Sequence, residues 1–131
     1  MTSKKKIGGT IMPEFSEESL RRLRTVDHHL QVLFKVVIQH RDCTILEGYR
    51  DQVTQNRYYA EGKSQLQWPD GKHNSVPSKA VDVAPFFPNS GVSMNRLEVV
   101  EFGHYVLGVR DCLNMGHKIR WGGDWDGDWL S

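Results

Sequence analysis

The sequence has no apolar run that approaches the roughly 20 residues needed to span a bilayer, and its N-terminus lacks the apolar core of a signal peptide. It also lacks an excess of one charge, because 17 Lys and Arg residues nearly balance 16 Asp and Glu residues. Cys43 and Cys112 are its only cysteines, and their spacing suits neither a zinc pair nor an obvious disulfide. These absences predict a protein made in the cytoplasm, with no membrane span and no nucleic-acid partner.

With 131 residues and no repeats or low-complexity linkers, the chain fits one domain. The first eleven residues have no periodicity, carry a lysine run and precede a second methionine, Met12. We expect residues 1–11 to be a disordered leader and residues 12–131 to form a single domain.

From residue 16 onward, helical and extended patterns alternate. Ser16 is a suitable N-cap for a long amphipathic helix, and Asp51 for a second one that Gly62 ends. The expected elements are helices over residues 16–37, 51–61 and about 93–115, and strands over residues 43–48, 79–85 and 118–121. Three helices packed around a small antiparallel sheet predict an α+β fold.

An aspartate stands at the centre of the strand KAVDVAP, which is otherwise built for burial. Alternation places Asp82 on one face between two alanines, and a carboxylate there is costly unless it is paired or bound to a cation. One interpretation is a salt bridge to a nearby Lys or Arg. The other is a metal ligand, with His73 arriving from the preceding loop, since one imidazole and one carboxylate are two of the three protein ligands of a hydrolytic zinc site.

The segment HNSVPSKAVDVAP resembles the metal-binding segment of the zinc D-alanyl-D-alanine carboxypeptidase family, especially its phage branch of L-alanyl-D-glutamate endopeptidases, or endolysins. Three further segments match this family in the same order, and the resemblance covers about residues 13–129. They are FSEESLRRL, ILEGYRDQVTQNRYYAEGKS and IRWGGDWD. An ordered match of four segments is more specific than any one motif.

The resemblance implies that His73 and Asp82 coordinate Zn²⁺ and that Arg50 is a catalytic residue facing the scissile carbonyl or a substrate carboxylate. A structural salt bridge is the alternative for Arg50. Gln55 matches the family's helix glutamine and is expected to bind substrate, with a solvated helix position as the alternative.

The implied substrate is the peptidoglycan stem peptide, cleaved at an L-alanyl-D-glutamate or a D-alanyl-D-alanine bond. We expect a monomer made in the host cytoplasm that acts on the cell wall after release. A relative that binds wall peptides without cleaving them, and an interaction module in which Asp82 is only salt-bridged, are the alternatives.

The chain departs from the family pattern in two places. Nine positions separate His73 from Asp82, where many members have seven, and this fits a tolerated loop insertion. The family also carries a third ligand and a catalytic acid in a strand beyond the GGDW turn, and no such segment precedes Ser131. We therefore expect the last strand to be missing and a sheet edge to be uncovered. His104 and His117 are the later histidines that are left as replacements for the third metal ligand.

The acidic tail carries a second metal signal. Asp124, Asp126 and Asp128 alternate as in the first half of a calcium loop, and the resemblance extends to phage members with a calcium ion in this turn. The Gly and Glu that would complete the loop are absent, so a solvated acidic turn is the alternative reading.

Overall fold

The computed structural model describes residues 2–7, 10–122 and 128–131. It confirms the predicted α+β class, with a small antiparallel sheet and four α-helices in the described part of the chain. In chain order the elements are β1 (Thr2–Ile7), β2 (Thr10–Phe15), α1 (Glu17–Leu23), α2 (His28–Val37), β3 (Cys43–Glu47), α3 (Gln52–Ala60), the 3₁₀ turn η1 (Lys72–Asn74), β4 (Ala80–Phe87), β5 (Gly91–Val92), α4 (Arg96–Cys112), β6 (Arg120–Trp121) and β7 (Asp128–Leu130).

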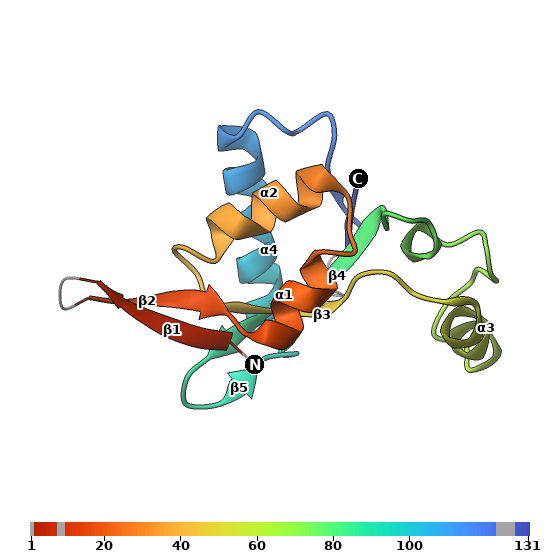
Figure 1. Ribbon diagram of the computed structural model, residues 1–131, viewed down its shortest axis with the longest axis horizontal. Helices are drawn as coiled ribbons and strands as arrows, with labels where there is room; N and C mark the ends of the chain where they lie inside the picture. Colours follow the sequence, from red (N-terminus) through yellow and green to blue (C-terminus); the bar gives the residue numbers. More distant parts are fainter. Residues whose placement is uncertain (1, 8–9, 123–127) are drawn as a thin grey trace.

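The main sheet has the strand order β3-β4-β7-β6, and β5 pairs with the far end of β4. Helix α1 packs on β3, α4 packs on β4, and α2 packs on α4, so these three helices cover the core (Figure 1). Helix α3 lies apart from them at the other end of the molecule. None of the helices in the described ranges is long and apolar enough to cross a bilayer.

The single helix predicted over residues 16–37 is wrong, because the structure divides it into α1 and α2. The break falls at Val26, which forms a parallel bridge with Ser78, and at Asp27, whose backbone N–H donates to the Ser78 carbonyl at 2.8 Å. Asp27 then caps α2, since its carboxylate accepts a hydrogen bond from the His29 backbone at 2.8 Å. Apolar spacing alone did not reveal this internal cap.

Residues near the N-terminus, for which the sequence predicts disorder, form a two-stranded hairpin in the structure. β1 pairs antiparallel with β2, in a register that joins Thr2 to Phe15 and Ile7 to Thr10. In the sequence two glycines separate the strands, a pair that is typical of two-residue hairpin connections. The disorder expected for residues 1–11 therefore does not hold for residues 2–7 and 10–11, which are strand residues.

The tail supplies a strand that the sequence did not predict. β7 lies between β4 and β6 and pairs Leu130 with Ala80 and Trp129 with Trp121. This edge of β4 is therefore paired, whereas the sequence led us to expect an uncovered sheet edge. Trp129 is 1% exposed and its indole stacks on that of Trp121, with ring centroids 5.6 Å apart. Burial of this ring holds the strand in place.

Two glycines of α4 provide a matched test of this packing. A Cβ atom at Gly103 would lie 2.4 Å from the indole of Trp121, whereas nothing lies within 4 Å of one at Gly108. Gly103→Ala is expected to lower the free energy of unfolding by about 1–3 kcal/mol through overpacking. Gly108→Ala is expected to raise it by about 0.5–1 kcal/mol through helix propensity. Urea denaturation measures both, and equal stabilisation by the two changes would contradict this packing.

Candidate metal centre

His73 lies in η1 and is buried, with a ring orientation fixed by the backbone. Its Nδ1 is 2.8 Å from the Gly48 carbonyl oxygen, which only accepts, so Nδ1 carries the proton. Its Nε2 is 3.0 Å from Asp128 Oδ1 and 3.6 Å from Asp82 Oδ1. Metal-binding histidines are typically held in this way, because a backbone acceptor at one ring nitrogen leaves the other for the metal.

The register of the sheet places three carboxylate residues opposite one another on neighbouring strands. Asp82, in the middle of β4, pairs with Glu47 at the end of β3 on one side and with Asp128 at the start of β7 on the other. A register shift between Ile45 and Glu47 places the glutamate opposite Asp82. Three neighbouring strands thus each contribute one acidic side chain beside His73.

The charges of this cluster perturb one another. Burial alone would lower the pKa of His73, but hydrogen bonds to Asp128 and Asp82 raise it to about 10. Burial raises the pKa of Asp82 to about 6 in spite of His73. The pKa of Asp128 is lowered, because its hydrogen bonds to His73 and Asp82 outweigh its own burial. The cluster therefore concentrates negative charge around one imidazole, an arrangement that a divalent cation would stabilise.

The donor atoms fit a metal ion. One ligand atom from each of Glu47, His73 and Asp82 lies within 4.8 Å of the others. One imidazole nitrogen with carboxylate oxygens suits Zn²⁺ and related divalent ions. The structure thus brings together the two predicted residues, His73 and Asp82, and adds Glu47 and Asp128, which the sequence analysis did not assign to this site.

The histidines considered as replacement ligands lie elsewhere. The ring of His104 on α4 packs against the indole of Trp121, with centroids 5.9 Å apart. His117, in the segment that joins α4 to β6, lines a different hollow. Of the three aspartates considered for calcium, Asp124 and Asp126 lie outside the described residues, and Asp128 faces His73.

Asp128→Asn tests whether the tail strand takes part in metal binding. The amide keeps the size of the side chain but removes a negative charge 3.0 Å from His73 Nε2. Affinity for a divalent metal is expected to fall by about tenfold to a hundredfold, as measured by competition with a chromophoric chelator. Asp111→Asn, which removes an exposed carboxylate paired with Arg110, is the control. Equal affinities in the two variants would exclude Asp128 from the site.

Arg50 follows β3 and points into the same cleft. Its Nε and Nη2 donate to Glu47 Oε1 at 2.9 and 2.5 Å, and Nη1 donates to Gln55 Oε1 at 3.0 Å. Its Cζ lies 4.7 Å from the centroid of the Tyr58 ring, and Nη2 is 3.8 Å from Asp82 Oδ2. The salt bridge considered for Arg50 is present, and its guanidinium also lies near Asp82, while its catalytic role stays a prediction.

Gln55 is fully buried on α3, so the solvated position considered for it is wrong. Its Oε1 accepts hydrogen bonds from Arg50 and from Asn74 Nδ2, and its Nε2 donates to Ser64 Oγ and to the Leu66 carbonyl. These four bonds use its full capacity. We propose that Gln55 positions Arg50 and the loop before His73, instead of contacting substrate as predicted.

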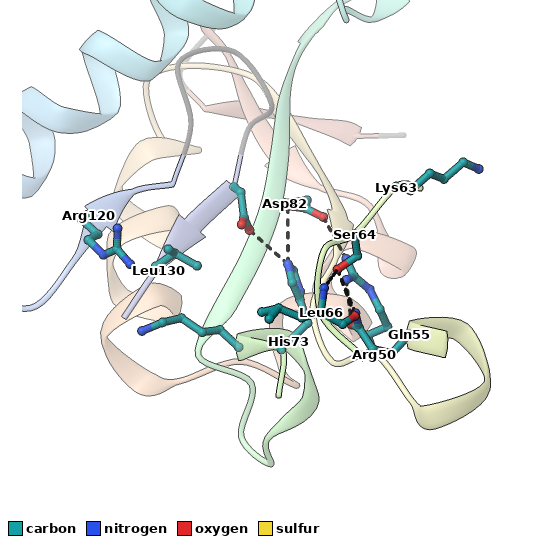
Figure 2. A pocket seen from close by; sticks show the side chains of 12 residues that line it. Arg50, Gln55, Lys63, Ser64, Leu66, His73, Asp82, Arg120 and Leu130 are labelled. Carbon is teal, nitrogen blue, oxygen red and sulfur yellow. Dashed lines mark hydrogen bonds and ion pairs between the residues drawn. The ribbon is translucent and has the colours of Figure 1, made fainter. Parts of the chain in front are cut away.

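An open cleft of about 420 Å³ is lined by His73, Asp82, Asp128, Arg50 and Gln55, among others. Figure 2 shows His73 and Asp82 at its centre, with Arg50, Gln55, Ser64 and Leu66 on one side and Arg120 and Leu130 on the other. The volume suits a short stretch of extended peptide. The arrangement combines carboxylate and imidazole groups that fit a metal ion with a fixed guanidinium, and both can assist amide hydrolysis.

Comparison with known proteins agrees with this chemistry. The family model described as phage L-alanyl-D-glutamate peptidase matches residues 12–130, which are nearly the whole chain. The protein belongs to this family. It is therefore a hydrolytic peptidase by class. The crystal structure of the L-Ala D-Glu endopeptidase ChiX of Serratia marcescens has a similar fold, with a TM-score of 0.71 and 24% sequence identity over 88% of this chain and 87% of that chain. No curated protein matches the sequence.

Proposed function

We propose that this protein is a zinc-dependent endopeptidase that hydrolyses the L-alanyl-D-glutamate bond of peptidoglycan stem peptides. The observation that carries the proposal is the placement of the His73 ring. Gly48 fixes its Nδ1, while its Nε2 faces Asp82 and Asp128 in an open cleft. The family description supports this bond over the D-alanyl-D-alanine bond that the sequence left open. We further propose a monomer that is made in the host cytoplasm and reaches the wall after release.

We assign metal binding to His73 and Asp82, whose ligand atoms lie within 4.8 Å of each other, and to Asp128, whose Oδ1 lies 3.0 Å from His73 Nε2. A bound Zn²⁺ would supply Lewis-acid polarisation of the amide carbonyl and activation of water. Arg50 is oriented to donate to the carbonyl oxygen as negative charge develops there. Glu47, whose carboxylate lies within 4.8 Å of the His73 and Asp82 ligand atoms, is assigned as the proton acceptor instead of a ligand, since Arg50 already binds its Oε1.

The test is cleavage of purified stem peptides, followed by mass spectrometry of the products. The proposal expects an L-alanine C-terminus and a new D-glutamate N-terminus, loss of cleavage after chelation, and recovery with Zn²⁺. Release of terminal D-alanine would instead assign carboxypeptidase specificity. Binding of wall peptides without any cleavage, in protein shown to contain zinc, would overturn the proposal and support a catalytically impaired relative.

A further inference from the structure

A second hollow, of about 240 Å³, continues the cleft on the side away from Arg50. The two share Lys72, Arg120 and Leu130 as lining residues. Beyond these the hollow is lined by the segment from Gly116 to Ile119 and by Ser131. A peptide that crosses the metal centre would therefore meet this surface at one end.

The side chains that line the hollow carry a net positive charge. Lys72, Lys118 and Arg120 line it, and no Asp or Glu of the described residues does. Within the described ranges, no carboxylate lies at ion-pair distance from any of the three. We call the hollow that these three residues line the basic hollow.

The cations at the other end of the cleft are already paired. Arg50 forms its ion pair with Glu47, and Lys63 lies 3.2 Å from Glu61. The Lys63 side chain also points away from His73, and Arg120 lies on the opposite side of His73 from both (Figure 2). The positive charge available to a ligand is thus concentrated at the end formed by the basic hollow.

We propose that the basic hollow binds a free carboxylate on the glutamate side of the scissile bond. This inference rests on the proposed function. Glutamate has two carboxyl groups and only one can carry the peptide onward, so the leaving half of an L-alanyl-D-glutamate substrate bears a negative charge beside the cut. The hollow therefore sets the direction of the stem peptide, with its acidic half over Arg120 and its alanyl half toward Arg50.

The test compares two peptides that contain the L-alanyl-D-glutamate bond and differ only in whether the second glutamate carboxyl is free or amidated. Lys72→Met/Arg120→Met removes two charges from the hollow. Arg24→Met/Lys35→Met removes the same charge from exposed positions that line neither the cleft nor the hollow. Each protein is assayed for kcat and KM, and binding of both peptides is measured by calorimetry in the presence of chelator.

The wild type and the control are expected to prefer the free carboxylate by about tenfold, mainly in KM, and the preference should weaken at high salt. The Lys72→Met/Arg120→Met protein should lose the preference, so that the ratio of kcat/KM for the two peptides falls to about one. A preference that survives in this variant, or is absent from the wild type, would overturn the inference. A binding preference without cleavage of either peptide would reject the peptidase and leave the basic hollow supported.

Discussion

His73→Ala is expected to remove metal binding and to reduce peptide cleavage below detection. His73 supplies the imidazole of the cluster, and Nε2 is the atom on which the Asp82 and Asp128 carboxylates converge. Without it, two half-buried acids face each other with no nitrogen ligand between them. Metal affinity should fall by at least about a hundredfold, since even partners outside the coordination shell contribute ten- to a hundredfold. Elemental analysis and chelator competition provide the measurement.

The same residue predicts a pH dependence in the wild type. Metal binding requires the unprotonated Nε2, but in the metal-free protein the pKa of His73 is raised to about 10 by its carboxylate neighbours, against the effect of burial. A proton must therefore leave His73 at neutral pH before metal binds. Below pH 10, the affinity for metal should therefore increase by about tenfold with each unit that the pH rises, as long as binding releases one proton. A pH-independent affinity would contradict the assignment of His73.

His104→Ala is the matched control for His73→Ala. It removes the same side chain from an exposed position on α4, where the ring packs against Trp121. We expect metal content and cleavage to match the wild type. Loss of metal in His104→Ala but not in His73→Ala would show that the ligand set lies elsewhere and would restore the replacement ligand considered from the sequence.

The sequence predicted those parts of the site that depend on local pattern. The strand around Asp82, the helix capped by Asp51 and the arrival of His73 from a loop all follow from neighbouring residues, and the structure places them as expected. Glu47 and Asp128 were missed because their place in the site does not follow from their neighbours in the sequence. They meet Asp82 through pairing across β3, β4 and β7, and this register joins residues far apart in the chain.

Two other differences have separate causes. The break between α1 and α2 depends on a tertiary bridge from Val26 to Ser78, which apolar periodicity does not encode. The burial of Gln55 depends on a loop that folds back over α3 to supply the Leu66 carbonyl and the Ser64 hydroxyl. In both cases the deciding contact comes from a segment outside the helix. Propensity within the helix was therefore insufficient.

Arg50→Lys is expected to lower kcat by about a hundredfold and leave metal content nearly unchanged. Three of its N–H groups bind Glu47 and Gln55 while its face lies on Tyr58, which fixes the plane of the guanidinium and the direction of its remaining donors. An ammonium group cannot make these contacts together. Loss of one oriented donor to a developing oxyanion has this magnitude in other hydrolases.

Arg57→Lys is the control, because Arg57 is exposed and lies 5.5 Å from the Tyr58 centroid without contacting the cleft. Its cleavage kinetics should match the wild type. The division of the Arg50→Lys effect between kcat and KM then separates the two roles that the resemblance implies. A fall in kcat assigns Arg50 to the scissile carbonyl, whereas a rise in KM with unchanged kcat would assign it to a substrate carboxylate and contradict its proposed role in the transition state.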